Sequence, residues 1–273
     1  MLKGLNCLKF AIFWVFILST ASVAKQDENS KGFFSKVLLI DSEICLELIP
    51  KDLLKKLDKI ESQSPKECQK KFQIDARPFH GQLTLVSFLT HLEQNQKIHL
   101  IHLNPFNVNG QQNIETFRLI HKQLSEEVFS AVMMPMAGLL PALKELNIDS
   151  WRSPVFLASG QKGAGSLSET QFMWPHSQLL KKKSELIFIV GTYLPLNNDL
   201  VVENTELFHI EQIDLYLSEN ESFSEFTGSS RATAEAAAKA LNFCHETTES
   251  FLKCLKNKMT TIPTTSGREV PTL

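Results

Sequence analysis

The sequence lacks an excess of charge of either sign. Its 28 Lys and Arg residues against 30 Asp and Glu residues give a formal net charge of −2 at pH 7. Proteins that grip the phosphate backbone of nucleic acids carry a basic surface instead. The one run of three lysines, Lys181 to Lys183, is expected to lie in a solvated turn. We therefore expect no nucleic-acid partner.

Long apolar runs are absent beyond the first part of the chain. In residues 1–24, Lys3 and Lys9 precede an apolar run at 10–18, and small residues follow at 22–24. This order is typical of a secretory signal peptide that is cleaved before residue 25. A retained membrane anchor is the alternative, although the apolar run is short for a span. We expect an exported protein, periplasmic or secreted, with no membrane span after cleavage and a short N-terminal segment at residues 25–33.

Cysteine is scarce, and the spacing of the few cysteines fits no zinc site. Four remain after the predicted signal peptide: Cys45, Cys68, Cys244 and Cys254. An even number in an exported chain suggests disulfides, and the local pairs Cys45–Cys68 and Cys244–Cys254 are the simplest of three connectivities. Four free buried thiols are the alternative. Because no loop of clustered aspartates is present either, we expect no metal and no cofactor.

Short apolar segments alternate with segments at helical spacing along most of the chain. Strands are expected at residues 37–42, 98–103, 128–134, 155–158, 185–191 and 213–216, and helices at 49–60, 82–92, 114–124, 139–146, 230–241 and 247–257. This alternation predicts a three-layer α/β fold with a mainly parallel sheet and helices on both faces. We expect one domain at residues 34–258. Residues 259–273 are rich in Thr and Pro and are expected to form a flexible tail.

Residues 226–241 begin with small polar residues and continue with many alanines. Gly228-Ser229-Ser230 predicts a turn and an N-terminal cap, and alanine favours the helix that follows. Ser230 should therefore lie in the first turn of a buried helix. The free N–H groups and partial positive charge at a helix start can stabilise an anion that forms beside a serine nucleophile. A serine that only caps the helix is the alternative.

An acid, a histidine and a serine occur in the order Asp41, His80, Ser230. Asp41 ends an apolar strand, and His80 lies at the start of a predicted helix. Serine is a weak nucleophile until an imidazole takes its proton, and the imidazole needs a carboxylate to orient it. Each of these residues alone would more often have a structural role. The hypothesis of a catalytic role therefore rests on the three residues together.

Seven segments in this order resemble the subtilisin-like serine proteases (subtilases, peptidase family S8), of which this chain would be a divergent member. They are Val37–Ser42; Phe79–Gly81; Ile98–Leu103 with Gly110; Ala131–Gly138; Val155–Gly163; Met173–Pro175 with Leu186–Gly191; and Ile213–Tyr216 with Gly228–Ser230. Together they span roughly residues 34 to 245. The resemblance implies that the domain at 34–258 is a subtilase-like catalytic domain.

The resemblance also implies roles for individual residues. Ser230 would be the nucleophile, His80 the general base and then acid, and Asp41 the residue that orients the imidazole. Gln161 stands where the family has an asparagine that donates to the oxyanion. The substrate cleft would be lined by Met134, Pro135, Met136, Ala137, Gly138, Ala158 and Gly160.

Several residues depart from the pattern of the family. Gln161 is one methylene longer than asparagine, and Pro135 removes an N–H from the strand edge that would pair with substrate. Arg231 follows the serine where a small or sulfur side chain is usual, and Ala234-Glu235 replaces Pro-His. Two functions remain open: an exported serine endopeptidase, and a catalytically impaired subtilase-fold protein that binds peptide or a partner protein. An unrelated exported α/β protein is the third alternative.

Overall fold

Strands and helices alternate along the chain, and they assemble into one compact unit at residues 32–273. A computed structural model describes residues 34–62, 79–107, 111–136, 147–160, 179, 182, 184–197, 200–203, 213–219, 226–244 and 248–273. The predicted signal peptide and the segment at 25–33 lie outside these residues. Both therefore stay predictions.

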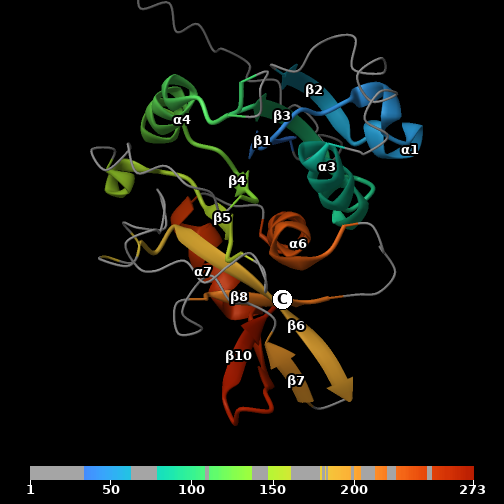
Figure 1. Ribbon diagram of the computed structural model, residues 1–273, viewed down its shortest axis with the longest axis vertical. Coiled ribbons are helices and arrows are strands. Elements are labelled where there is room, and N and C mark those ends of the chain that lie inside the picture. The colour runs from blue at the N-terminus through green and yellow to red at the C-terminus, as the bar shows by residue number, and fades with distance from the viewer. Residues whose placement is uncertain are drawn as a thin grey trace, which may run out of the picture. The chain divides into compact units, whose positions relative to one another are not determined.

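A single sheet runs through the described residues (Figure 1). Its strands are β1 (Phe34–Ile40), β2 (Leu57–Ser62), β3 (Lys97–Leu103), β4 (Ala131–Met134), β5 (Val155–Ala158), β6 (Ile187–Asn197), β7 (Leu200–Glu203), β8 (Leu215–Ser218), β9 (Thr260–Pro263) and β10 (Glu269–Thr272). They follow the order β2-β3-β1-β4-β5-β6-β8-β10-β9, and β7 pairs with β6. The β6–β7 and β9–β10 pairs are antiparallel, and the other pairs are parallel.

Successive residues of the central strands alternate between two apolar cores, as the period of two in a strand requires. In β1, Val37 and Leu39 join one core, whereas Leu38 and Ile40 join the other. The same alternation holds in β4, β5, β6 and β8. A strand buried on both faces reads as a continuous apolar run, which is why these strands can be located from sequence.

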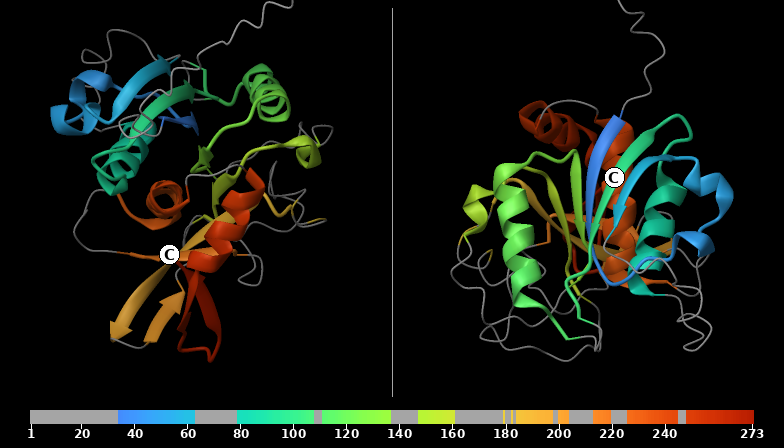
Figure 2. Two further views of the ribbon diagram at one scale, coloured as in Figure 1. Left: turned by 180° about the vertical axis from the view of Figure 1, so that it is seen from behind. Right: turned by 90° about the horizontal axis from the view of Figure 1, so that it is seen from above.

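Helices cover both faces of the sheet, which confirms the predicted three-layer α/β fold (Figure 2). The helical segments are η2 (Leu46–Leu48), α1 (Lys51–Leu54), α3 (His80–His91), α4 (Ile114–Glu126), η4 (Ile148–Ser150), α6 (Gly228–Phe243) and α7 (Thr248–Lys258). Helices α3, α6 and α7 contribute to one core, and α4 and η4 contribute to the other. The alanines of α6 are fully buried and let this helix lie close to the strands beneath it.

The strand order reverses between β1 and β4. On one side of β1 lie β3 and, beyond it, β2. The strands from β4 onward lie on the other side of β1. In open parallel sheets, such a switch point leaves a crevice at the carboxyl ends of the two strands, where ligands commonly bind. The residues that follow β1 and β4 are Asp41 and Pro135.

Residues 259–273 are not the flexible tail that their composition suggested. They form the hairpin β9–β10, and β10 continues the sheet beside β8 through Thr272 and Tyr216. Val270 is fully buried in the core. Threonine is a β-branched residue that suits strands, and proline is tolerated at a sheet edge. The edge of β8 that does not pair with β6 binds β10, and this partner cannot be recognised from the sequence of residues 259–273.

The amphipathic helix expected at residues 49–60 is also wrong in its second half. The helix α1 ends at Leu54, and the chain continues as β2, the edge strand that pairs with β3. Lys56 explains the break between them, because its buried ammonium group donates to the carbonyls of Leu89 and Leu92 at the end of α3. This tertiary contact replaces the local helical continuation.

Candidate active site

Asp41 lies at the carboxyl end of β1, as predicted, and its carboxylate is buried. Its Oδ1 accepts a hydrogen bond from the N–H of Ser42 at 2.6 Å, and its Oδ2 accepts one from the hydroxyl of Thr84 at 2.8 Å. Its own N–H donates to the carbonyl of Leu103 at the end of β3. Buried carboxylates need such partners, and these also hold the group in one orientation.

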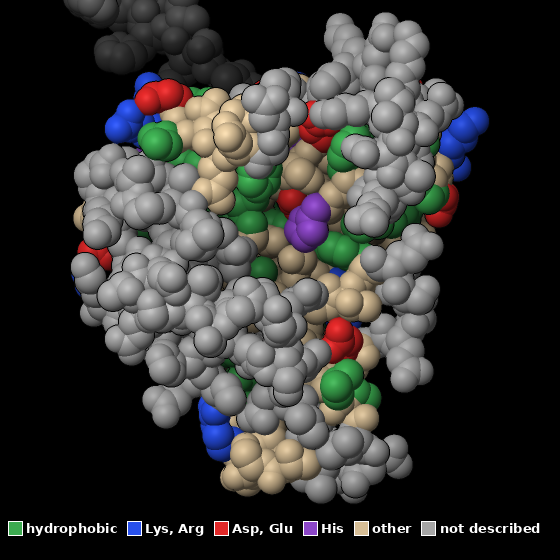
Figure 3. Space-filling view, in the orientation of Figure 1, with side chains coloured by type: hydrophobic (Ala, Val, Ile, Leu, Met, Phe, Trp, Pro, Cys, Tyr) green, Lys and Arg blue, Asp and Glu red, His purple; other side chains and the backbone are tan. Residues whose placement is uncertain are grey.

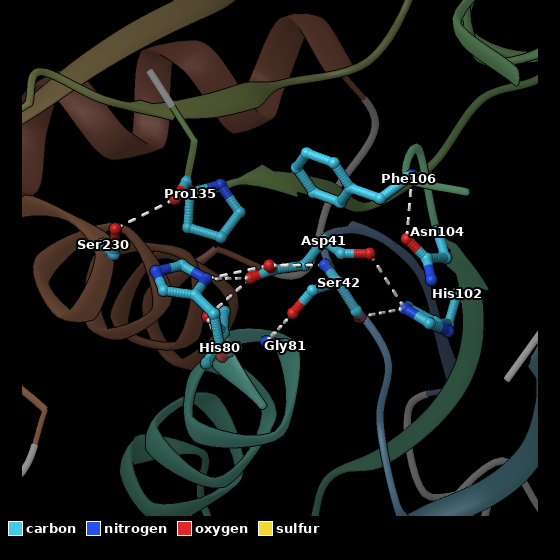
Figure 4. A network of polar contacts seen from close by, with 10 residues as sticks. Asp41, Ser42, His80, Gly81, His102, Asn104, Phe106, Pro135 and Ser230 are labelled. Carbon is cyan, nitrogen blue, oxygen red and sulfur yellow. Dashed lines mark hydrogen bonds and ion pairs between the residues drawn. The ribbon is translucent and has the colours of Figure 1, made fainter. Parts of the chain in front are cut away.

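His80 is the first residue of α3, and its ring faces Asp41 (Figure 4). Its Nδ1 lies 2.8 Å from Oδ1 and 2.9 Å from Oδ2 of Asp41. Since a carboxylate only accepts, Nδ1 carries the proton, and in the neutral ring Nε2 is then the acceptor. The edge of the ring also meets Phe226, with 5.4 Å between the ring centroids.

The protonation of His80 is set by two opposing effects. Burial of part of the ring lowers its pKa, but the hydrogen bond and the negative charge of Asp41 together raise the pKa above the ordinary value of 6.5. The side chain nevertheless remains 43% exposed. Figure 3 shows a histidine side chain at the surface of this face of the molecule, with acidic atoms beside it.

Gly81 allows α3 to begin directly against the residue that follows Asp41. Its N–H donates to the Ser42 hydroxyl at 2.8 Å, which gives a free N–H of the helix start a partner from another segment. A Cβ at this position would lie 2.2 Å from the carbonyl oxygen of Ser42. Only glycine fits this close approach, which brings His80 and Asp41 together.

Ser230 is in the first turn of α6, as predicted, but its hydroxyl does not cap the helix. The N-cap residue is Thr227, and Gly228 turns the chain with a φ of 76°. The Ser229 hydroxyl accepts a hydrogen bond from the N–H of Gly160 at 3.0 Å. The Ser230 hydroxyl donates to the carbonyl of Pro135 at 2.9 Å. The two serines thus link the start of α6 to the ends of β5 and β4.

Ser230 and Asp41 lie on opposite sides of the His80 ring (Figure 4). The Asp41–His80 hydrogen bond is formed, whereas within the described part of the chain no hydrogen bond joins His80 and Ser230. The site therefore contains a coupled acid and imidazole, with a serine nearby that is bonded to the end of β4.

The arrangement of strands and helices in this chain is similar to that of a protein of known structure. A solved crystal structure of a cold adapted subtilisin-like serine proteinase matches with a TM-score of 0.56 over 90% of this chain and 90% of the other, at 15% sequence identity. The fold is subtilisin-like. No protein-family model and no curated protein sequence matches the chain. At this identity, the similarity concerns the fold alone.

The predicted cleft residues are only partly covered by the structure. Gln161, Ala137 and Gly138 lie outside the described residues, so the oxyanion donor stays a prediction. Of the others, Met134, Pro135, Ala158 and Gly160 are buried, and Met136 is half-buried. Gly160 has a φ of 96°, which favours glycine directly after β5. Their contact with substrate also stays a prediction.

Two departures from the resemblance turn out to be partners on α6 of this subtilisin-like fold. The guanidinium of Arg231 lies 2.9 Å from the carboxylate of Glu235, and it also donates to the carbonyl of Ser218 at the end of β8. Arg231 is 1% exposed and Glu235 is 7% exposed. Lys239 and His91 approach the same carboxylate. The pair therefore ties the helix that carries Ser230 to the sheet.

Sequence reasoning missed three residues that support Asp41: Ser42, Thr84 and His102. Thr84 follows His80 by one helical turn, so a search for a hydroxyl at i+4 could have found it. No local pattern points to His102. It lies in β3 and reaches the carbonyls of Asp41 and Ser42 only because β3 pairs with β1.

The remaining predictions concern disulfides, metals and membranes. Cys244 and Cys254 form the predicted disulfide between the end of α6 and α7, whereas Cys68 lies outside the described residues. Among the described residues, no cluster of His, Cys, Asp and Glu is arranged to hold a metal ion. None of the helices described is long and apolar enough to cross a membrane.

Proposed function

We propose that the protein is an exported serine endopeptidase that uses Asp41, His80 and Ser230 to hydrolyse peptide bonds. The observation that carries this proposal is the hydrogen bond between the buried Asp41 carboxylate and His80 Nδ1, with Ser230 beyond the opposite side of the ring. The subtilisin-like fold supports it, because Asp41 lies at the carboxyl end of β1 and Ser230 is bonded to the residue that follows β4, where sites collect in such sheets.

The chemistry would proceed by acyl transfer. The Ser230 hydroxyl would rotate from the Pro135 carbonyl toward His80 Nε2 and attack the substrate carbonyl while the imidazole takes its proton. His80 would then give this proton to the leaving amine, and water would release the acyl group by the same route. Asp41 would hold the Nδ1 proton and stabilise the imidazolium.

The developing oxyanion needs donors about 2.7–3.1 Å away. The N–H groups at the start of α6 are proposed for this role, because the first turn of a helix leaves its N–H groups without intrahelical partners. The amide of Gln161 is proposed as a further donor. Substrate would bind along the end of β4, where Pro135 contributes a carbonyl acceptor and no N–H donor.

Export is proposed from the predicted signal peptide at residues 1–24 together with the Cys244–Cys254 disulfide. Disulfides persist in oxidising compartments and are rare in the cytosol. Expression of the full-length chain followed by N-terminal sequencing of the exported product tests this part. A product that begins at residue 25 is expected, and a product that retains residues 1–24 contradicts it.

A fluorophosphonate that carries a fluorophore tests the catalytic part, because it labels only an activated serine. We expect labelling of the folded protein and none of Ser230→Ala. Ser125→Ala on α4 is a matched control, since the described partners of this hydroxyl, His121 and Ser150, lie on the far side of the sheet. Absence of labelling in a protein that unfolds cooperatively refutes the proposal.

A second function is favoured by the Ser230–Pro135 hydrogen bond, which holds the hydroxyl away from His80. A subtilisin-like fold fixed in this state would bind an extended peptide, or a segment of a partner protein, without cleaving it. In that case the folded protein stays unlabelled and binds a fluorescent peptide saturably. Cleavage of the same peptide would exclude this alternative.

A further inference from the structure

A second histidine lies directly behind the Asp41–His80 pair. His102 belongs to β3 and is fully buried. Its Nε2 lies 2.9 Å from the carbonyl oxygen of Ser42 and 3.3 Å from that of Asp41, and its Nδ1 lies 2.9 Å from the hydroxyl of Ser62. Figure 4 shows the contacts of His102 with Asp41 and Ser42. The two ring nitrogens therefore bind different parts of the chain, Nε2 the turn after β1 and Nδ1 the end of β2.

The partners of His102 determine which ring nitrogen carries the proton. Carbonyl oxygens only accept, so Nε2 must donate to Ser42 and Asp41. Nδ1 is then an acceptor in the neutral ring, and the Ser62 hydroxyl donates to it. Burial lowers the pKa of His102 even though its carbonyl partners and the charges of Asp41 and Glu43 act in the opposite direction. The ring is therefore neutral at pH 7.

Ser42, the residue that follows Asp41, is held from several directions. Its N–H donates to the Asp41 carboxylate, so the position of this peptide and the orientation of the carboxylate depend on each other. The Ser42 hydroxyl accepts from Gly81 beside His80, and the Ser42 carbonyl accepts from His102. A rotation of this turn would disturb both the acid and the start of α3.

We propose that His102 is a positioning residue that fixes the turn after β1, so that the Asp41 carboxylate faces His80. Ser62 at the end of β2 holds the His102 ring in the required tautomer and orientation. The consequence for catalysis rests on the proposed serine endopeptidase function, whereas the effect on the Asp41–His80 pair does not.

Four variants test this proposal. His102→Leu removes both hydrogen-bonding atoms, His102→Gln keeps a donor, and Ser62→Ala removes only the more distant partner. The matched control is His121→Leu, which removes another histidine with a lowered pKa from α4 on the opposite face of the sheet. The His121 ring accepts from the Trp151 indole and contacts neither Asp41 nor His80 in any described hydrogen bond.

The first measurement is the pKa of His80, taken from NMR spectra of protein with 13C-labelled histidine. We expect the pKa to fall in His102→Leu, because the carboxylate that raises it is less well placed. His102→Gln should restore part of the wild-type value. Ser62→Ala should cause a smaller fall, and no further change when added to His102→Leu, because Ser62 acts only through His102. His121→Leu should leave the value unchanged.

The second measurement is the rate of fluorophosphonate labelling. A misplacement of about 1 Å far from the reacting atoms can cost on the order of 10²-fold in rate, and we expect a loss of about that size in His102→Leu. If wild type is not labelled but the pKa of His80 still falls in His102→Leu, the endopeptidase function is wrong and the positioning role stands.

An unchanged pKa of His80 in folded His102→Leu overturns the proposal, whether or not wild type is labelled. If His102→Leu does not fold, the decision passes to His102→Gln and Ser62→Ala. An unchanged pKa of His80 in both of these variants then overturns the proposal. A further fall of this pKa when Ser62→Ala is added to His102→Leu contradicts the inference that Ser62 acts only through His102.

Discussion

The acid–base side and the serine side of the candidate site are built differently. On the acid–base side, the Asp41 carboxylate is bonded to His80, Thr84 and the N–H of Ser42, and His102 supports the same turn from behind. On the serine side, the Ser230 hydroxyl makes one hydrogen bond within the described residues, to the Pro135 carbonyl. The groups of the acid–base side are held by several mutual hydrogen bonds, whereas rotation about one side-chain bond can redirect the Ser230 hydroxyl.

In the proposed endopeptidase, this difference would mean that the acid and the imidazole are oriented before substrate binds. The orientation of a buried acid must be fixed in advance, because no water can satisfy it after burial. A serine hydroxyl needs only a short rotation between two acceptors. What α6 must supply is the position of the Ser230 backbone, and the contacts of Ser229, Arg231 and Glu235 provide it.

The largest effect is expected from Asp41→Asn, which removes the charge that orients His80. Loss of the equivalent carboxylate in a serine–histidine–aspartate site costs about 10⁴-fold in rate. We expect a loss of this order in fluorophosphonate labelling and a fall in the pKa of His80. Asp149→Asn, at an exposed ion pair with Lys182, is the control and should change neither. Equal labelling of both variants would show that the acid–base side is not used.

Arg231→Met should lower the free energy of unfolding, because Arg231 holds the helix that carries Ser230. Removal of one partner from a buried ion pair typically costs about 3–5 kcal/mol, because the other charge is left buried. Because Lys239 remains 3.1 Å from the Glu235 carboxylate, we expect a loss at or below the lower end of that range in urea denaturation. Glu235→Gln added to Arg231→Met should recover part of it, since no buried carboxylate then remains without its guanidinium. Additive losses in the double variant would contradict coupling between the two side chains.

Gly81→Ala should separate His80 from Asp41 without removing either side chain. The added Cβ would lie 2.2 Å from the Ser42 carbonyl, so the helix start or the turn must move. We expect labelling to fall by about 10²-fold, as for other small misplacements of reacting groups. Thr90→Ala at the exposed end of α3 controls for changes to the helix itself. Wild-type labelling in Gly81→Ala would mean that the close approach is unimportant.

Ser229→Ala should affect the serine side more mildly. It leaves the buried N–H of Gly160 without its acceptor, which costs about 1–3 kcal/mol. Chemical denaturation should show this loss, with labelling of Ser230 reduced only in proportion to the shift of α6. Labelling lost to the same extent as in Asp41→Asn would indicate that Ser229, rather than Ser230, is the reactive serine.

The smallest effect expected is a pH dependence of opposite sign for the two histidines of the acid–base side. His80 has a raised pKa in the folded state, so its contribution to stability is present below pH 6.5 and is lost as the pH rises through the folded pKa. His102 has a lowered pKa, so stability is lost as the pH falls from 6.5 toward its folded pKa.

Urea denaturation of His80→Gln and His102→Gln across this pH range separates the two contributions. We expect His102→Gln to weaken the loss of stability on acidification, and His80→Gln to strengthen it slightly. The His80 effect should be the smaller one, because its side chain is 43% exposed and solvent screens its interaction with Asp41. The same direction of change in both variants would contradict the assigned shifts.

The central strands, the positions of Asp41 and His80 and the start of α6 could be predicted from sequence. Apolar runs of strand length end at polar residues, and an alanine-rich segment follows Gly228-Ser229-Ser230. These signals are local, so they survive without knowledge of the fold. The tail at residues 259–273 was wrongly predicted, because its strands depend on the edge of β8 and not on their own composition.

The contacts within the site were less accessible. The sequence order of acid, histidine and serine predicted that the three would be brought together, but not that the Ser230 hydroxyl would bond to Pro135. The departures at Arg231 and Glu235 looked independent in sequence, and they proved to be one ion pair across a helical turn. A spacing of i and i+4 permits such an ion pair, but its loss has a large effect on stability only when the pair is buried.

The α/β class, the strands buried on both faces and the local positions of Asp41, His80 and Ser230 can be read from the amino-acid sequence. These follow from short-range periodicity and from the preferences of helix starts. Three other features cannot be read from the sequence: that His102 lies behind Asp41, that β10 extends the sheet and that Ser230 is bonded to the end of β4. Each depends on which strands become neighbours, and strand order is set by long-range pairing that no local pattern encodes.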